Sequence, residues 1–325
     1  MDVNFGSSNF KSSNLNSLTF DSLEKKKIMI IGPAWPLRGG LATFDELLCR
    51  ALISAGHDCR IISFSLQYPG FLFPGTTQFD ETGKSPEGIT IETKINSVNP
   101  FNWLSVGNYI KREEPDFILI RYWLPFMGPS LGTIARRAKK NGKTKVIAIV
   151  DNAIPHEKRP GDKMFSSYFL KSCDAYLTMS QKVLADLEQF TNSTNKLFTE
   201  HPLYTSFGEV EEKEKARRHL LLEESGRYLL FFGLIRRYKG LDLLLEAIGY
   251  LKNLKPQTLN FKLVIAGEFY EDARQYHDLI DRLGIKDQLI LKTDFVPDSE
   301  VKYYLCAADA VIQPYRNATQ SGVTP

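Results

Sequence analysis

The sequence contains little cysteine and no long hydrophobic run. Its four cysteines, Cys49, Cys59, Cys173 and Cys306, are widely scattered without a CxxC pair. This favours a reduced, cytosolic compartment and argues against a structural zinc site. No stretch approaches the roughly 18 uninterrupted apolar residues of a membrane helix. The N-terminal segment is rich in Ser and Asn and has no apolar core, so we expect no signal peptide.

Several motifs of metal and nucleotide chemistry are also missing. The sequence has no HExxH, GxSxG, Cys/His ligand spacing, GxGxxG or GxxxxGK(S/T), so none of the sites that these patterns mark is indicated. It has no DxD pair either, and we therefore expect no metal and no resident cofactor. The net charge of +3 is too small to indicate a nucleic-acid partner, and the cations are not interleaved with stacking aromatic residues.

The sequence does contain two successive series of strands and helices. Its 325 residues favour two domains of about 150 residues each. Short β-branched runs alternate with segments of helical spacing, which is typical of a parallel sheet. In the first series we expect strands over 27–32, 59–65, 117–121, 145–150 and 175–180, and helices over 41–55, 101–114, 130–140 and 183–190. In the second we expect a solvated helix within 209–226, strands over 228–233, 261–268, 289–292 and 310–315, and helices over 241–251, 271–283 and 298–307.

This alternation predicts an α/β protein with two doubly wound, Rossmann-like domains. We place a polar, disordered tail at 1–24, an N-terminal domain at 25–205 and a C-terminal domain at 206–325. The second series stops after its fourth strand, so we expect the second domain to be incomplete. Ligands bind beyond the carboxyl ends of strands in such sheets, and the space between the two domains is the expected site.

Two loops of the first domain carry candidate site residues. Gly39 and Gly40 lie between the first strand and the first helix, where glycine serves either a tight turn or the close approach of a ligand to a helix N-terminus. His156 lies in DNAIPHEKRPGDK, directly after the strand at 145–150. It either donates a proton to a substrate oxygen or belongs to a solvated surface loop.

A cationic loop follows the first strand of the second domain. In FFGLIRRYKGLDLLLEA, Gly233 ends the strand, and Arg236, Arg237 and Lys239 precede Gly240 and a helix. Cations beside a helix start are typical of a diphosphate site, because arginine offers forked hydrogen bonds and lysine a point charge. The alternative is a solvated turn.

Three further segments are less specific. VIAGEFY places Gly267 and Glu268 directly after a strand. PYRNATQSGV, 314–323, brings hydroxyl and amide side chains after the last strand, either as contacts to a phosphate or sugar or as an ordinary polar loop. Residues 136–145 hold six cations, which form either a solvated helix end or a patch for anionic lipid headgroups.

Taken in order, these motifs resemble the group 1, family 4-like glycosyltransferases over roughly residues 27–325. The resemblance rests on the Gly-Gly loop, the PHE loop, FFGLIRRYKGLDLLLEA, VIAGEFY and PYRNATQSGV. It implies the GT-B fold with a C-terminally truncated second domain. It also implies a retaining, metal-independent transfer of a sugar from a nucleotide-sugar donor. The second domain would bind the donor, and the first would mainly bind the acceptor.

The resemblance implies roles for single residues. Lys239 and Arg236 would contact the donor diphosphate, and His156 would lie beside the donor sugar; these three form the expected catalytic set. Gly40 would lie beside the diphosphate, and Glu268 would line the nucleotide pocket. The full donor-binding set comprises Gly39, Gly40, Gly233, Arg237, Gly267, Glu268, Thr319, Gln320, Ser321, Gly322 and Val323. The sequence departs from the family at 319–322, where TQSG stands for EGFG.

We therefore expect a hexosyltransferase-type enzyme with a nucleotide-sugar as co-substrate. The acceptor would be a glycan, a polysaccharide or a lipid-linked molecule. We expect a cytoplasmic protein, with peripheral contact to the inner face of the membrane through 136–145 as a further expectation. The alternative is a catalytically weak or inactive nucleotide-sugar-binding fragment.

Overall fold

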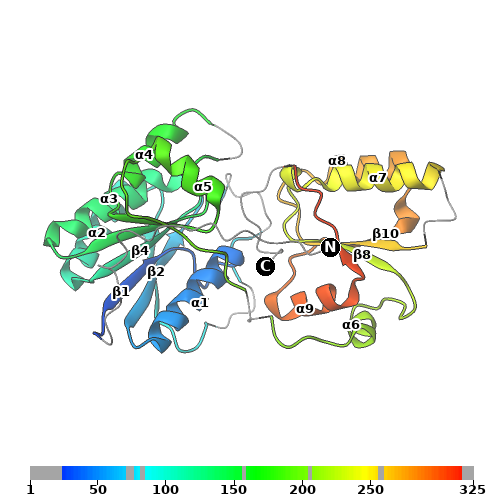
Figure 1. Cartoon of the computed structure of the whole chain (residues 1–325), viewed down its shortest axis with the longest axis horizontal. Helices are drawn as coiled ribbons and strands as arrows, with labels where there is room; N and C mark the ends of the chain where they lie inside the picture. Colours follow the sequence, from blue (N-terminus) through cyan, green and yellow to red (C-terminus); the bar gives the residue numbers. More distant parts are fainter. Residues whose placement is uncertain are drawn as a thin grey trace, which may run out of the picture.

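The computed structural model describes residues 24–70, 77–80, 85–155, 159–203, 207–254 and 260–316. Strands and helices alternate along these residues and form two separate parallel sheets. Figure 1 shows one sheet with its helices in each half of the molecule, and the loops of the two halves meet between them. The predicted α/β fold with two Rossmann-like domains is confirmed.

The first sheet contains, within the described residues, seven parallel strands in the order β3-β2-β1-β4-β5-β6-β7. They are β1 (Lys27–Ile31), β2 (Asp58–Leu66), β3 (Ile91–Asn96), β4 (Phe117–Tyr122), β5 (Lys145–Val150), β6 (Ala175–Thr178) and β7 (Lys196–Phe198). Ile30 and Ile31 point to opposite faces and both are fully buried. A central strand covered on both faces therefore needs an uninterrupted apolar run, as in KIMII.

Helices cover both faces of the first sheet. Helix α1 (Gly40–Ser54) packs on one face through Cys49. The opposite face is covered by α2 (Pro100–Glu113), α3 (Gly128–Ala138), α4 (Asp162–Leu170) and α5 (Gln181–Asp186). Short 3-10 turns lie at η2 (Pro125–Met127), η3 (Lys139–Asn141) and η4 (Leu187–Gln189).

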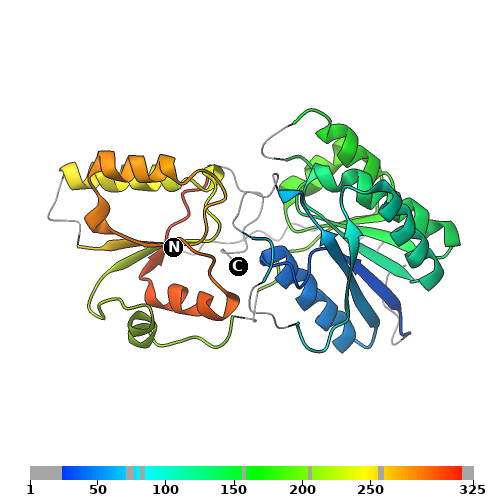
Figure 2. The same ribbon diagram turned by 180° about the vertical axis from the view of Figure 1, so that it is seen from behind.

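The second sheet, as far as the structure describes it, has four parallel strands in the order β10-β9-β8-β11. They are β8 (Tyr228–Phe232), β9 (Lys262–Ala266), β10 (Leu289–Lys292) and β11 (Ala310–Val311). Helices α7 (Leu241–Leu254) and α8 (Arg274–Leu283) lie on one face, and α6 (Lys213–His219) and α9 (Asp298–Ala307) lie on the other, as both views show (Figures 1 and 2). The 3-10 turns η5 (Arg237–Lys239) and η7 (Lys286–Gln288) precede α7 and β10.

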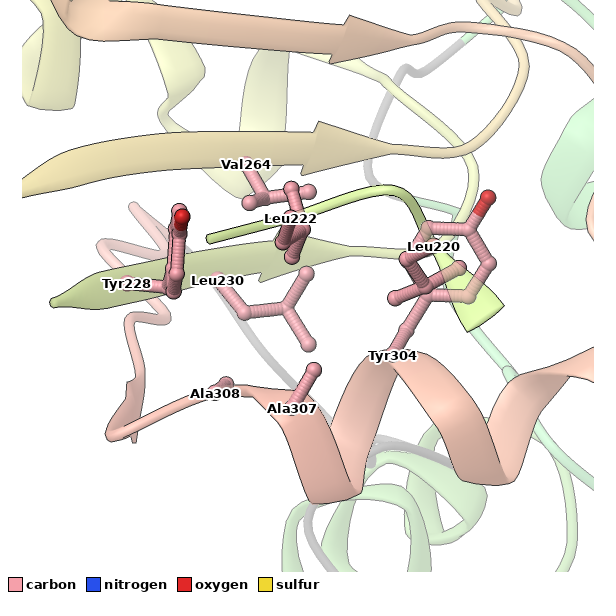
Figure 3. Close-up of a pocket in the computed structure, with 8 residues that line it drawn as sticks. All are labelled: Leu220, Leu222, Tyr228, Leu230, Val264, Tyr304, Ala307 and Ala308. Atoms are coloured by element: carbon pink, nitrogen blue, oxygen red, sulfur yellow. The ribbon is translucent and has the colours of Figure 1, made fainter. Parts of the chain in front are cut away.

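An apolar crevice lies beneath the second sheet, on the face that α6 and α9 cover (Figure 3). Its lining side chains come from β8, β9, α9 and the segment after α6: Leu220, Leu222, Tyr228, Leu230, Val264, Tyr304, Ala307 and Ala308. It has no volume that a water molecule could enter. The crevice is therefore part of the packed core of the second domain and offers no room for a polar ligand.

Several elements differ from the prediction. The sequence analysis missed β3 and β7, which are edge strands with little buried surface and hence no continuous apolar run. It also missed α4, which buries only Ser166, Phe169 and Leu170. The last strand ends at Val311 instead of 315, and Pro314, which has no N–H to donate, could not continue the ladder to 315. Helix α6 is much shorter than 209–226, because Leu221 adopts a left-handed conformation with φ 58°.

The predicted domain boundaries fall largely outside the described residues. Of the tail at 1–24, only Glu24 is described, and the boundary between 205 and 206 lies in an undescribed interval between β7 and α6. The domain limits and the incompleteness of the second domain stay predictions. Within the described ranges, no helix combines the length and the apolar character that a membrane span requires.

Candidate active site

The two domains touch where the loops that follow β1, β9 and β10 meet. Arg38, between β1 and α1, donates from Nη2 to Oε2 of Glu268, which follows β9, at 2.7 Å. Thr43, in the first turn of α1, donates from Oγ1 to Oδ2 of Asp298, the first residue of α9, at 3.0 Å. These contacts bring the Gly-Gly turn of the first domain beside the VIAGEFY loop of the second, as the position of both loops after parallel strands predicts.

The Gly-Gly turn leaves open space at the start of α1. Gly39 is the N-cap with φ 108°, a conformation that favours glycine, and Gly40 is the first helical residue. A Cβ atom added to either glycine meets no atom within 4 Å. The positive φ thus explains glycine at 39, whereas no contact within the described residues requires glycine at 40.

The cationic loop of the second domain turns sharply between β8 and α7. Ile235 is buried and anchors the loop, because its N–H donates to the carbonyl of Glu268 at 2.8 Å. Arg236 then stands exposed, and Lys239 ends the η5 turn. Gly240 takes a left-handed conformation with φ 73°, and a Cβ there would lie 2.1 Å from the carbonyl oxygen of Pro314. This tight packing directs the loop into the start of α7.

Lys239 is the buried cation of this loop. Lys239 is 8% exposed, and its Nζ lies 5.7 Å from the centre of the Tyr315 ring. The ammonium group forms no hydrogen bond or ion pair with any residue that the structure describes. Burial and, to a smaller extent, the nearby charge of Arg236 lower the pKa of Lys239 to about 8. A cation held out of water without an anionic partner is suited to bind an anion.

Arg236 lies beside Tyr270, which follows β9 in the same domain. Its guanidinium lies 5.2 Å from the centre of the Tyr270 ring. Burial raises the pKa of Tyr68, a first-domain residue after β2, to about 12, while a hydrogen bond from Trp123 and the charge of Arg236 lower it.

Gly233 and Gly267 directly follow β8 and β9, and their backbones are in close contact. Both have positive φ, 97° and 132°. A Cβ at Gly267 would lie 2.4 Å from the carbonyl oxygen of Gly233. The fold itself therefore requires glycine at 267, so a ligand is not needed to explain it.

Arg237 lies apart from Arg236 and Lys239. Its side chain lines a polar hollow of about 280 Å³ whose other walls come from α7 and α8, among them Asp242 and Glu246. The loop is held from the other side by Arg316, which donates to the Arg237 carbonyl at 3.0 Å and to both carboxylate oxygens of Asp242. The structure thus links the Gly39–Gly40 turn, through Arg38 and Glu268, to the loop that carries Arg236 and Lys239, and sets the side chain of Arg237 to one side.

The remaining predicted site residues lie outside the described residues. They are His156, Thr319, Gln320, Ser321, Gly322 and Val323. Their assignments stay predictions. The neighbouring Asp151, at the start of the loop that leads to His156, is described and is held by a buried arginine.

That arginine, Arg121 at the end of β4, was missed by the sequence analysis. It is 1% exposed and donates from Nε and Nη2 to Oδ1 of Asp45 at 3.0 and 2.9 Å, and from Nη1 to Oδ1 of Asp151 at 3.0 Å. Its guanidinium lies 3.9 Å from the centre of the Phe44 ring. Burial raises the pKa of Asp45 to about 7, against the opposing effect of Arg121. Arg121 thereby ties α1 to the loop after β5. A lone arginine in the apolar run FILIRY was the available signal.

The basic segment 136–145 is mostly engaged within the protein. Arg136 donates to the carbonyls of Gly132 and Tyr168, and Lys139 pairs with Asp174 at 2.6 Å. Lys143 pairs with Asp116 at 3.2 Å. These contacts favour a helix end that is anchored to the fold over a free cationic patch.

Comparison with known families supports the resemblance. The family described as "Glycosyltransferase Family 4" matches residues 38–197, and the family described as "Glycosyl transferases group 1" matches residues 212–322. The first match lies within the seven-stranded domain and begins after β1, and the second includes all four strands of the other sheet. The order of the two families is the order of the two domains.

Comparison with individual known proteins also supports the resemblance to glycosyltransferases. A D-inositol 3-phosphate glycosyltransferase from Thermobifida fusca (strain YX) is 35% identical over 116 residues, which are 34% of this chain and only 26% of that protein. Sucrose-phosphate synthase from Thermosynechococcus elongatus is similar in structure with a TM-score of 0.68 at 15% identity, over 92% of this chain and 78% of the other. Anabaena Alr3699/HepE, solved in complex with UDP-glucose, has a TM-score of 0.65 at 13% identity, over 90% and 75%. The GT-B fold is confirmed by these structures.

Proposed function

Because the chain belongs to the glycosyltransferases that join a family 4 region to a group 1 region, we propose that it transfers a sugar from a nucleotide-sugar donor to an acceptor. The observation that carries this proposal is the buried ammonium group of Lys239, which stands beside Arg236 at the end of β8. A nucleoside diphosphate is the leaving group of such a transfer. It gains negative charge as the bond between the anomeric carbon of the sugar and the diphosphate oxygen breaks. Two cations placed there stabilise that charge in the transition state.

We propose that the donor diphosphate lies between this loop and the N-terminus of α1. The open space at Gly39 and Gly40 allows phosphate oxygens to approach the helix N–H groups. Arg236 supplies forked hydrogen bonds, and Lys239 supplies a point charge. Cations and helix dipoles together would neutralise the leaving group, which is the basis for proposing a metal-independent reaction.

The finer features of the reaction are proposals of the same kind. We infer retention of anomeric configuration from the family resemblance, together with a glycan, polysaccharide or lipid-linked acceptor. Likewise proposed are a role of His156 beside the donor sugar and a cytoplasmic location. UDP-glucose is bound by the Anabaena protein, so a UDP-sugar is a suitable first probe for this chain.

The test is the release of nucleoside diphosphate from UDP-glucose, ADP-glucose and GDP-mannose, with and without an oligosaccharide acceptor. We expect release from at least one donor, and a loss of about a hundredfold in Lys239→Ala. Lys286→Ala is the matched control, because Lys286 is exposed and lies in η7, far along the chain from the loop. Donor binding without any release would favour the alternative, a nucleotide-sugar-binding fragment.

A further inference from the structure

The Arg38–Glu268 ion pair is shielded from water at the junction of the two domains. The two side chains are 11% and 7% exposed, and their atoms are 2.7 Å apart. Water and salt weaken such a pair far less than an exposed one. The partners are separated by 230 residues in sequence and belong to different domains. The pair therefore resists separation of the domains at this point.

Further contacts fix the orientation of Arg38. Its Nε donates to the carbonyl of Thr77 at 3.0 Å, and its guanidinium lies 4.0 Å from the centre of the Phe295 ring, in the loop after β10. Its backbone N–H donates to the carbonyl of Gln78 at 3.0 Å. Because a planar guanidinium can satisfy a carboxylate, a carbonyl and an aromatic face at once, lysine could not reproduce this arrangement.

These contacts connect the two halves of the proposed donor site. Arg38 directly precedes Gly39 and Gly40. On the other side, the carbonyl of Glu268 accepts from the N–H of Ile235, the residue before Arg236. A short path of polar contacts thus runs from the start of α1 to the cationic loop. The Thr43–Asp298 hydrogen bond joins the same first turn of α1 to α9.

We propose that Arg38 and Glu268 are positioning residues, whose ion pair sets the Gly39–Gly40 turn against the Arg236–Lys239 loop in the arrangement that sugar transfer requires. The proposal rests on the proposed function. Small errors in the placement of groups around a reacting centre lower rates steeply. A pair that holds the two halves of the site in register therefore acts on the rate through the groups it orients, without touching the sugar.

A double-mutant cycle tests this. Arg38→Gln and Glu268→Gln remove one charge each, the double variant removes both, and Arg38→Lys keeps the charge but loses the fork. Two quantities are measured for each protein: the radius of gyration by small-angle X-ray scattering without donor, and kcat and KM for the donor that the wild type uses. We expect each single variant to increase the radius of gyration and to lower kcat about tenfold. The double variant should be no worse than either single variant, and Arg38→Lys should fall between wild type and Arg38→Gln.

Two results would overturn the proposal. One is additivity, in which the double variant loses the product of the single losses, because Glu268 would then act on the nucleotide independently of Arg38. The other is wild-type scattering and wild-type kcat in both single variants. If the wild type releases no nucleoside diphosphate, the proposed function fails, but the scattering series alone still decides whether the pair sets the domain arrangement.

Discussion

Lys239 directs its ammonium group toward the ring of Tyr315, at 5.7 Å from the ring centre, and no described carboxylate neutralises it. An aromatic face offers a cation only partial compensation for lost hydration. Among the described residues, this buried charge thus has no carboxylate partner at the place where the leaving group is proposed to bind. Removal of this charge should therefore change stability and turnover in opposite directions.

Replacing Lys239 with methionine should stabilise the protein and abolish turnover. Because burial lowers the pKa of Lys239 to about 8, the charged form is disfavoured in the folded state. Methionine keeps the apolar stem and removes the charge. We expect the free energy of unfolding at pH 7 to rise by about 1–3 kcal/mol, measured by urea denaturation. The gain should shrink between pH 8 and 10, where the wild-type lysine loses its proton. A destabilised variant would show that the charge has a structural partner.

The pH dependence of turnover should report the same lysine. If the ammonium form binds the donor, kcat/KM falls as the pH rises through about 8, the pKa of Lys239 in the free protein. The bound diphosphate raises the pKa of Lys239, so kcat should fall only at higher pH. Lys239→Arg should move the decline in kcat/KM above pH 10, since arginine stays protonated. A pH profile that is the same in Lys239→Arg and wild type would assign the titration to another group.

Two glycines should respond in opposite ways to alanine. At Gly40 a methyl group meets no atom and enters a helix, so we expect unchanged or slightly raised stability, by up to about 1 kcal/mol. Donor KM should rise about tenfold if phosphate approaches this turn. At Gly267 a methyl group would lie 2.4 Å from the Gly233 carbonyl, so Gly267→Ala should lower the melting temperature. Gly40→Ala with a wild-type KM would place the donor elsewhere.

Asp45→Asn should remove a pH dependence of stability. Burial raises the pKa of Asp45 to about 7, above its value of about 3.9 in an unfolded chain. The wild type is therefore penalised as the pH rises from about 4 to 7, because the folded state must lose a proton that it retains better than the unfolded state. Relative to Asp45→Asn, the wild type should lose on the order of 2 kcal/mol over this range, measured by denaturation at several pH values. A constant difference would mean that Asp45 is ionised throughout.

The sequence predicted the interior of the sheets better than their edges. Strands such as β1 and β5 are buried on both faces, and their β-branched runs show this directly. Strand β3 lies at an edge, has apolar residues only at Ile91 and Ile95 and fully buries only Ile95, so its local pattern is weak. Helix α4 was missed for the same reason, since a nine-residue helix with few buried positions has little periodicity to detect.

The residues of the candidate site also differ in how far the sequence predicts them. The positions of Lys239, Arg236 and the Gly-Gly turn beyond strand ends could be predicted, because each follows a strand that the sequence itself reveals, and their roles stay predictions. The proposed role of Arg38 could not be predicted, because it depends on contacts with Glu268 and Phe295, which lie in the other domain. The glycine at 267 is likewise explained only by the backbone of Gly233. Pairings across the fold are set by tertiary packing, and a single sequence does not display them.

The most direct test of the account is the binding of nucleoside diphosphates. UDP, ADP and GDP are titrated calorimetrically at pH 7 into the wild type, Lys239→Met and the control Lys286→Met. We predict that at least one of them binds the wild type and the control equally, and that Lys239→Met weakens it at least about tenfold, as the loss of one charge-assisted contact requires. Equal affinity in all three proteins, or no binding to the wild type, would contradict the account.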